Sequence, residues 1–244
     1  MTSTFDPEDL DCPRPQSGPV AISQLRSLAH DGRLPTASPA PGSSWSRIHH
    51  ARYGYAEPNP GYGDSRFAPF DAADDGHRVP TLYLAEAPEA TLLETALHGV
   101  LEWAHHEVAE LGLLGLHHAQ LLPPAGLTFA DLRHPQLQLL GLERSHLASS
   151  SAEHYPCTRA VAKAVHASKQ ALDGVLWHSR RTGLNGRPPA EVMVVFADRR
   201  STSRRKWSLA PHVHASGSLL EGAGRLWLDE LADQLDIAIF DDVG

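Results

Sequence analysis

The chain has 244 residues, of which 41% are hydrophobic and 20% are charged, and its formal net charge is −8 at pH 7. These values are typical of a globular protein with one domain of ordinary size, and they exclude a chain that is disordered along its whole length. The acidic balance argues against direct nucleic-acid binding, because nucleic-acid-binding domains usually carry a surplus of basic residues.

No apolar run approaches the ~20 residues that a membrane-spanning helix needs. The N-terminus also lacks a basic region followed by an apolar core, which a secretory signal would have. We therefore expect a cytoplasmic protein with no membrane partner. The two cysteines, Cys12 and Cys157, lie far apart and form no metal-ligand pair, which fits reduced thiols in the cytosol.

Residues 1–42 are rich in proline, serine and glycine, which predicts a flexible N-terminal segment. An amphipathic patch from Val20 to Leu28 interrupts this composition and predicts a small helix that packs on the domain or on a partner. A compact domain is expected over residues 43–244, with its first regular element near Trp45.

The first predicted strand runs from Trp45 to Tyr55 and leads into a loop rich in glycine and proline, Gly54 to Gly63. Loops of this kind more often form the rim of a site than a plain connection. A second strand is predicted from Leu82 to Ala85. Pro88 then begins a helix that we expect to reach about His105, because apolar residues follow at helical spacing.

The second half of the chain mixes strands and helices without a repeating βαβ rhythm, which favours the α+β class over a doubly wound sheet. The predicted strands and extended segments are Leu113 to Leu122, Leu127 to Leu132, Gly174 to Trp177, Val192 to Phe196 and Ile237 to Phe240. The predicted helices are Pro135 to Leu147, Tyr155 to Leu172 and Arg225 to Leu235.

Five residues whose side chains could bind a substrate or take part in a reaction follow one another beside predicted strands and helix starts: Arg47, Arg66, Tyr83, Glu94 and Ser179. The segments that carry them read WSRIHH, GDSRFAPF, LYLAEAPEATLLE and DGVLWHSRRTG, with the helical YPCTRAVAKAVH before the last one. This ordered set resembles the RES family of toxin domains over roughly Trp45 to Arg200. The resemblance implies an α+β, ADP-ribosyltransferase-like fold: a split, curved β-sheet with flanking helices and a central NAD cleft in residues 43–244.

The resemblance also implies an activity, which is cleavage of the nicotinamide–ribose bond of NAD⁺ by a toxin that depletes cellular NAD. NAD⁺ is then a consumed substrate, and no cofactor is expected. The bond breaks through an oxocarbenium-like transition state, so Glu94 would stabilise positive charge on the ribose as it develops. Relatives usually pair with an Xre-type helix-turn-helix antitoxin, which we expect as the partner.

The remaining residues are assigned to NAD binding by the same resemblance. Arginine meets phosphate oxygens with a planar fork of donors, which suits Arg47 and Arg66 to the pyrophosphate. Tyr83 would stack on the nicotinamide ring or bind a phosphate through its hydroxyl. Ser179 would hold a ribose hydroxyl, a phosphate oxygen or the acceptor, with Arg180 beside it. Arg47, Tyr83 and Ser179 are thus expected to act in catalysis together with Glu94.

The residues leave three functions open. The ADP-ribose moiety would pass to water or inorganic phosphate, as in a glycohydrolase or phosphorylase, or to a protein acceptor, as in a protein ADP-ribosyltransferase. The third possibility is a non-catalytic binding module with the same fold. Departures from the family pattern, such as Ile48 after the first arginine and the long acidic spacer between Arg66 and Tyr83, affect the rim of the pocket and its selectivity.

No metal site is expected, although the chain has 16 histidines. His98 and His105 lie seven positions apart on one predicted helix, which is a poor spacing for chelating one ion. No GxSxG, GxGxxG or GxxxxGK[ST] motif occurs, so a serine hydrolase, a dehydrogenase and a P-loop enzyme are all disfavoured.

Overall fold

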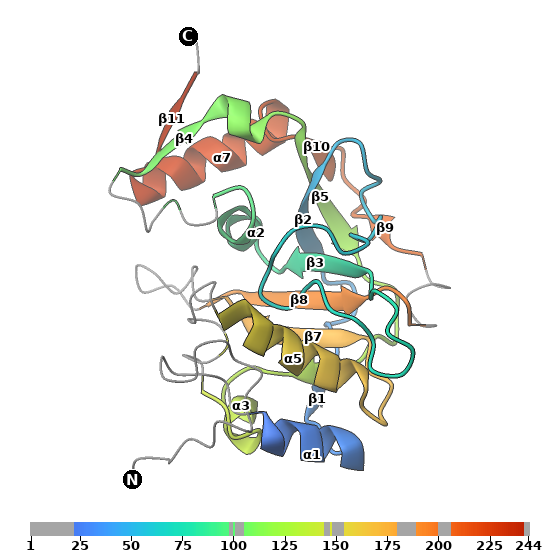
Figure 1. Ribbon diagram of the computed structural model, residues 1–244. Coiled ribbons are helices and arrows are strands. Elements are labelled where there is room, and N and C mark those ends of the chain that lie inside the picture. Colours follow the sequence, from blue (N-terminus) through green and yellow to red (C-terminus); the bar gives the residue numbers. More distant parts are fainter. Residues whose placement is uncertain are drawn as a thin grey trace.

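The computed structural model describes residues 22–97, 100, 105–143, 147, 154–179, 189–199 and 206–241. Within these ranges a large mixed sheet has the strand order β1-β6-β7-β8-β3-β2-β5-β10, with β9 added beside β5 (Figure 1). Its strands are β1 (Thr36–Ala37), β2 (Trp45–His50), β3 (Thr81–Ala85), β5 (Leu116–Leu122), β6 (Phe129–Asp131), β7 (Gly174–His178), β8 (Glu191–Phe196), β9 (Ser208–Leu209) and β10 (Ser216–Ser218).

Helices cover this sheet, and a small parallel pair of strands lies apart from it. The helical elements are α1 (Ser23–Asp31), α2 (Pro88–Glu94), η4 (Glu110–Leu113), α3 (Gln136–Leu139), α5 (Tyr155–His166) and α7 (Gly222–Leu235). The parallel pair is β4 (Glu107–Ala109) with β11 (Ala238–Phe240). The predicted α+β class is therefore confirmed. No helix in the described ranges is long and apolar enough to span a bilayer.

The sheet splits between β2 and β3. A single residue pair, Ser46 with Ala85, joins these two strands, whereas β2 and β5 share six pairs and β3 and β8 share five. In Figure 1, β3, β8 and β7 run across the view, while β2 and β5 run steeply upward. The predicted split, curved sheet is present, and α2 starts just beyond the split.

Side chains alternate across the strands and separate three apolar clusters. Leu82 and Leu84 of β3 pack with Trp45 and Met193 on one face of the sheet. Tyr83 and Ala85 point the other way, into the large cluster that α1 and α5 cover. The third cluster joins α2 to α7.

Residues 22–37 belong to this packed structure, so its edge does not fall at the expected boundary of residues 42 and 43. Ile22, Leu25 and Ala29 are buried in the large cluster, which confirms a helix from the amphipathic patch and places it on the domain. β1 pairs with β6, and the Gln170 side chain bonds both the N–H (2.9 Å) and the carbonyl (3.0 Å) of Leu34. The helical spacing of apolar residues thus predicted the structure of this segment correctly, whereas its content of proline, serine and glycine is typical of flexible segments.

The helix expected to run from Pro88 to about His105 instead ends at Glu94. Thr95 has non-helical torsions (φ −129°, ψ −87°), and the Leu97 N–H turns back to the Leu92 carbonyl at 2.8 Å. Leu97 is still buried, but it reaches its cluster by this reversal of the chain and not by a continuous helix. His98 lies outside the described residues.

Several other elements are shorter than predicted. The strand from Trp45 stops at His50, and the helix from Tyr155 stops at His166. The extended segment expected from Leu113 begins at Leu116, after a 3₁₀ turn. Within the helix predicted from Pro135 to Leu147, α3 covers Gln136–Leu139 and Leu147 is again helical. Element types were thus predicted better than their ends.

Gly174 gives a test of the sheet register. A Cβ there would overlap the Val194 carbonyl oxygen and stand 2.9 Å from its carbon, on a buried paired strand. Gly174→Ala should therefore lower the free energy of unfolding by about 3 kcal/mol in urea titrations. Gly112→Ala, where a Cβ meets nothing within 4 Å, is the control and should change it by less than about 0.5 kcal/mol. Equal effects would contradict the register.

Candidate active site

Glu94 and Ser179 meet, although 85 residues separate them in the chain. The Ser179 hydroxyl donates a hydrogen bond of 2.5 Å to Glu94 Oε1. Glu94 is the last residue of α2, and Ser179 follows directly after β7. The split between β2 and β3 leaves room for α2 at the end of the neighbouring strands, which is how two distant segments meet there.

The position of Glu94 depends on threonines that hold α2 in the split. Thr91 Oγ1 lies 3.2 Å from both the Ser46 carbonyl of β2 and the Ala87 carbonyl before its own helix, so its one hydrogen is shared between them and links the helix to the strand that has splayed away. Thr95 Oγ1 donates to the Thr91 carbonyl at 2.6 Å and satisfies a carbonyl near the end of the helix. Glu94 is therefore presented at a fixed end of a short helix.

Ser179 is held by its backbone and by complete burial. Its N–H donates to the Ala190 carbonyl at 2.9 Å, which continues the pairing of β7 with β8. The residue is 0% exposed. Strand alternation would place it on the face of Trp177, whose ring packs in the large cluster. A hydroxyl so constrained has little rotational freedom, so it fixes the carboxylate that it contacts.

The Tyr83 hydroxyl is occupied by hydrogen bonds from the segment that carries Arg66. It accepts a bond from the Phe67 N–H at 2.9 Å and lies 2.9 Å from Ser65 Oγ. Ser65 Oγ donates its own hydrogen to the Ala68 carbonyl at 2.8 Å, so the phenol is the donor to Ser65. Burial raises the pKa of Tyr83, and the bonds from Ser65 and Phe67 offset this only in part. The phenol stays protonated and has no hydrogen left for a phosphate.

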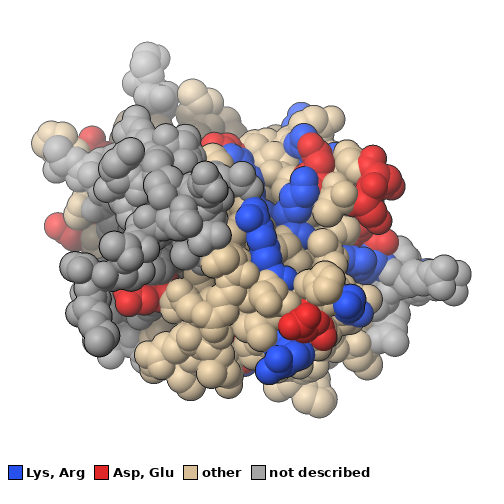
Figure 2. All heavy atoms as spheres, turned by 60° about the horizontal axis from the view of Figure 1, so that its bottom comes forward, with Lys and Arg blue, Asp and Glu red and all other residues tan. Residues whose placement is uncertain are grey.

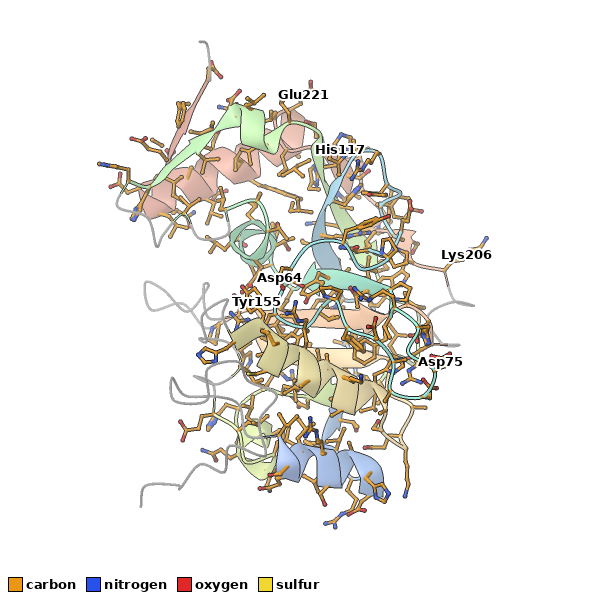
Figure 3. All side chains as sticks on the ribbon, in the orientation of Figure 1. Asp64, Asp75, His117, Tyr155, Lys206 and Glu221 are labelled. Atoms are coloured by element: carbon orange, nitrogen blue, oxygen red, sulfur yellow. The ribbon has the colours of Figure 1, made fainter. Side chains whose placement is uncertain are left out.

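Arg66 is anchored from α5. Its carbonyl accepts a hydrogen bond from Thr158 Oγ1, its guanidinium donates to the Leu147 carbonyl, and its Cζ lies 5.3 Å from the centre of the Tyr155 ring. Figure 3 shows Asp64, two residues earlier, beside Tyr155 between α2 and α5. Both Arg66 and Glu94 act electrostatically on Tyr83. Arg66, Tyr83, Glu94 and Ser179 therefore form one group, named the Glu94 cluster below.

Arg47 is not part of this cluster. Ser46 pairs with Ala85 and so lies on the face of Tyr83, which sends Arg47 to the opposite face, where it pairs with Ala119. Its guanidinium donates to the Tyr55 carbonyl at 2.7 Å. Burial lowers its pKa to about 10, which the Glu57 carboxylate partly offsets. Arg47 and Arg66, both expected at the pyrophosphate, therefore lie on opposite faces of the sheet, and the structure does not bring them together.

Arg47 opens instead into a hollow of about 230 Å³. The hollow is lined by the end of β2 and by the following loop, including Tyr53, Pro58 and Tyr62. The glycine- and proline-rich loop thus forms the rim of a hollow, as its composition indicated, but on the Arg47 side. Arg180, the other predicted NAD contact, lies outside the described residues.

Sequence reasoning assigned no role to Tyr155 and Thr158, although they hold Arg66. They lie three residues apart at the start of α5, and hence on one face of it. That spacing was the available signal. The Leu147 carbonyl could not have been predicted, because any residue type supplies a carbonyl.

The loop after Arg66 is fastened at its far end by a histidine–aspartate–histidine bridge. Asp198 Oδ2 lies 2.9 Å from His77 Nε2 and 2.8 Å from His166 Nε2, while His77 Nδ1 lies 2.5 Å from Asp75. Among the described residues, Asp74, Asp75 and His77 also place ligand atoms within 4.8 Å of one another, but all three are exposed. Figure 3 shows Asp75 at the end of the sheet away from Asp64 and Tyr155.

The hydroxyl of Tyr83 should prove structural. Tyr83→Phe leaves the buried Phe67 N–H without its acceptor, so the free energy of unfolding should fall by about 1–3 kcal/mol. Tyr62→Phe removes a hydroxyl from a side chain that is 71% exposed and should be neutral. Urea titrations of both variants check this, and an unchanged stability for Tyr83→Phe would refute the hydrogen-bonding scheme.

The Asp198 bridge should make stability depend on pH. Burial opposes ionisation of Asp198, but hydrogen bonds from His166 and His77, with help from Arg199, lower its pKa to about 2. Hydrogen bonds from Asp75 and Asp198 raise the pKa of His77. A lowered acid pKa stabilises the fold above about pH 4, and a raised histidine pKa does so below about pH 6.5.

Asp198→Asn should therefore cost most stability between about pH 4 and pH 6.5, and less on either side of that window. Thermal unfolding measured across pH checks this. Asp233→Asn, which changes an exposed carboxylate on α7, is the control and should show no such window. A cost that is the same from pH 3 to pH 9 would contradict the charged bridge.

Comparison with known proteins places this geometry in a family. The family model described as the RES domain matches residues 39–214, which is well over half of the chain. No match was found among curated proteins or among solved structures. The matched range contains every member of the Glu94 cluster, and the split sheet agrees with the ADP-ribosyltransferase-like fold of this family. The chain belongs to the RES-domain family.

Proposed function

We propose that this protein cleaves the nicotinamide–ribose bond of NAD⁺ and thereby depletes NAD in the cell. The observation that carries the proposal is the Glu94 carboxylate, held by the buried Ser179 hydroxyl beside Tyr83 and Arg66. RES domains are in general NAD-related and typical of toxin–antitoxin pairs, and this chain belongs to them. Both the site and the family therefore support NAD as a consumed substrate, and the proposal includes no further cofactor.

The chemistry needs little from the protein. Nicotinamide already carries a positive charge in NAD⁺, so it leaves without a general acid. The ribose becomes an oxocarbenium ion in the transition state. A carboxylate fixed near that carbon interacts more strongly with the transition state than with the substrate, and so lowers the barrier.

Ser179 acts as a positioning residue in this scheme. Its hydrogen is donated to Glu94 Oε1, and no hydrogen bond to Oε2 is found among the described residues. Oε2 is thus available to accept a ribose hydroxyl or to face the developing charge. Fixing one oxygen by hydrogen bonding removes motions of the carboxylate that would weaken this interaction.

Tyr83 and Arg66 would bind the substrate beside the carboxylate. Tyr83 is half-buried as a residue, and because its hydroxyl is already bonded to Ser65 and Phe67, its ring is the part that remains for stacking on nicotinamide. Arg66 would supply positive charge for the pyrophosphate. Arg47 lies on the opposite face from the Glu94 cluster, so it would contact NAD⁺ only where the dinucleotide extends past the split to that face. We propose Arg47 and Arg180 as further substrate-binding residues.

For the acceptor we propose water or inorganic phosphate, since no protein is needed to complete the cleavage. A protein ADP-ribosyltransferase would use the same cluster with a macromolecular acceptor, and a non-catalytic binding module would keep the fold without turnover. For the biological partner we propose an Xre-type helix-turn-helix antitoxin, in keeping with the toxin–antitoxin pairing of the family.

Glu94→Gln should reduce nicotinamide release from NAD⁺ by about 100- to 1000-fold in kcat, which corresponds to the loss of one electrostatic stabiliser. Glutamine still accepts the bond from Ser179, so the fold should persist. Ser179→Ala should cost about 10- to 100-fold. The measurement is release of nicotinamide from NAD⁺ in the absence of any other protein, with and without phosphate.

Glu89→Gln makes the same change of charge on the same helix and should keep full activity. Phosphorylated ADP-ribose formed only with phosphate identifies a phosphorylase, and free ADP-ribose identifies a glycohydrolase. Release that requires an added protein acceptor would favour the ADP-ribosyltransferase. Absence of release at any enzyme concentration, together with normal growth on expression, would favour the binding module.

A further inference from the structure

A cationic groove lies between α1 and α5, at the end of the molecule where those helices lie together. Its volume is about 440 Å³, and its polar lining comes from Arg26, His30, Lys163 and Lys169. The rest of the lining is alanine, at positions 29, 73, 160, 164 and 167. Figure 2, which brings this end forward, shows cationic side chains running in a row across the surface.

The groove has rigid walls. The Gln24 side chain donates to the Leu139 carbonyl at 2.7 Å, which fixes one end of α1 to α3. At the other end the Lys169 N–H donates to the Ala29 carbonyl at 3.2 Å. The bonds of Gln170 to Leu34 hold the same end. A groove formed in advance costs little ordering energy when a ligand enters it.

The two lysines of the groove are not neutralised by carboxylates of the described residues. Lys163 and Lys169 are exposed, and neither has an ion-pair partner among the residues that the structure describes. The chain as a whole has a net charge of −8, so a basic groove stands out against an acidic molecule. A basic rim on an acidic protein favours an anionic partner and disfavours a second basic one.

The shape and floor distinguish between anionic partners. Two helices form the sides, and the alanines on the floor let apolar side chains or a helix backbone approach closely. Helix-in-groove recognition uses an apolar stripe of this kind with charges along its rim. A nucleic acid would need stacking surfaces or a wide basic field, and the described lining contains no phenylalanine, tyrosine or tryptophan.

We propose that this groove docks an acidic amphipathic helix of a partner protein. The small apolar residues of that helix would rest on the alanine floor, and its carboxylates would meet Lys163 and Lys169. Ala160, Ala164 and Ala167 lie on the face of α5 away from Tyr155 and Thr158, which hold Arg66. The docked helix therefore leaves the Glu94 cluster uncovered, and the interaction does not depend on NAD cleavage.

The test uses the full chain and a fluorescent helical peptide built from glutamate, alanine and leucine. Lys163→Glu combined with Lys169→Glu should weaken peptide binding by about tenfold or more at low salt, because attraction becomes repulsion. Ala164→Gln, which fills the floor without changing charge, should weaken it as well. Lys206→Glu, far from the groove (Figure 3), is the matched control and should bind like the parent.

Three results would overturn the proposal. The first is equal binding by the parent and the lysine variants. The second is tighter binding of a single-stranded RNA of the same charge than of the peptide, with the RNA displacing the peptide from the site at Lys163 and Lys169. The third is binding only after Asp6, Glu8, Asp9 and Asp11 are replaced by asparagine or glutamine, which would identify the acidic N-terminal residues of this chain as the occupant.

Discussion

The rest of the structure depends on the separation of β2 from β3. These strands share the pair Ser46–Ala85 and then diverge, so their remaining backbone groups need other partners. The short helix α2 enters the opening, and Thr91 Oγ1 lies within hydrogen-bond distance of the Ser46 carbonyl, beside the one pair that remains. A continuous sheet would have extended across this space and left no room for α2, the helix whose last residue is Glu94.

The same separation leaves Arg47 and Arg66 on different faces of the sheet. Strand pairing passes from β8 through β3 to Ser46, and alternation then assigns Arg47 to the face of Leu82 and Leu84. Arg66 reaches the other side because its loop folds back onto the hydroxyl of Tyr83 and onto α5. The polar groups of the Glu94 cluster are thus mostly satisfied within the protein before any substrate arrives. Such an arrangement stays in place during the reaction and needs no reorganisation.

Local patterns predicted much of this fold. The alternation of Leu82, Tyr83 and Leu84 and the apolar run Val192 to Phe196 gave correct strands, because neighbours along the chain decide which face is buried. The end of α2 was missed, since Leu97 fits a helical stripe equally well when the chain reverses after Thr95. No local pattern marks that reversal.

The meeting of Glu94 and Ser179 was expected from the resemblance to a family and not from spacing. Contacts across 85 residues depend on topology, which a single sequence does not reveal. The side of the sheet taken by Arg47 was not predicted, for the same reason. It depends on the parity of one strand pair at the split, and a shift of one residue would have reversed it.

The partners of α2 have a further consequence for biosynthesis. Leu92 and Leu93, just before Glu94, pack in the cluster formed with Leu228 and Leu231 of α7. α7 leaves the ribosome after all four members of the Glu94 cluster, and β11, which completes β4, leaves after it. A nascent chain therefore contains the whole Glu94 cluster while α2, the helix that ends at Glu94, still lacks its packing partner α7. Packing of the Glu94 cluster against a completed α2–α7 pair would thus wait until α7 has been synthesised.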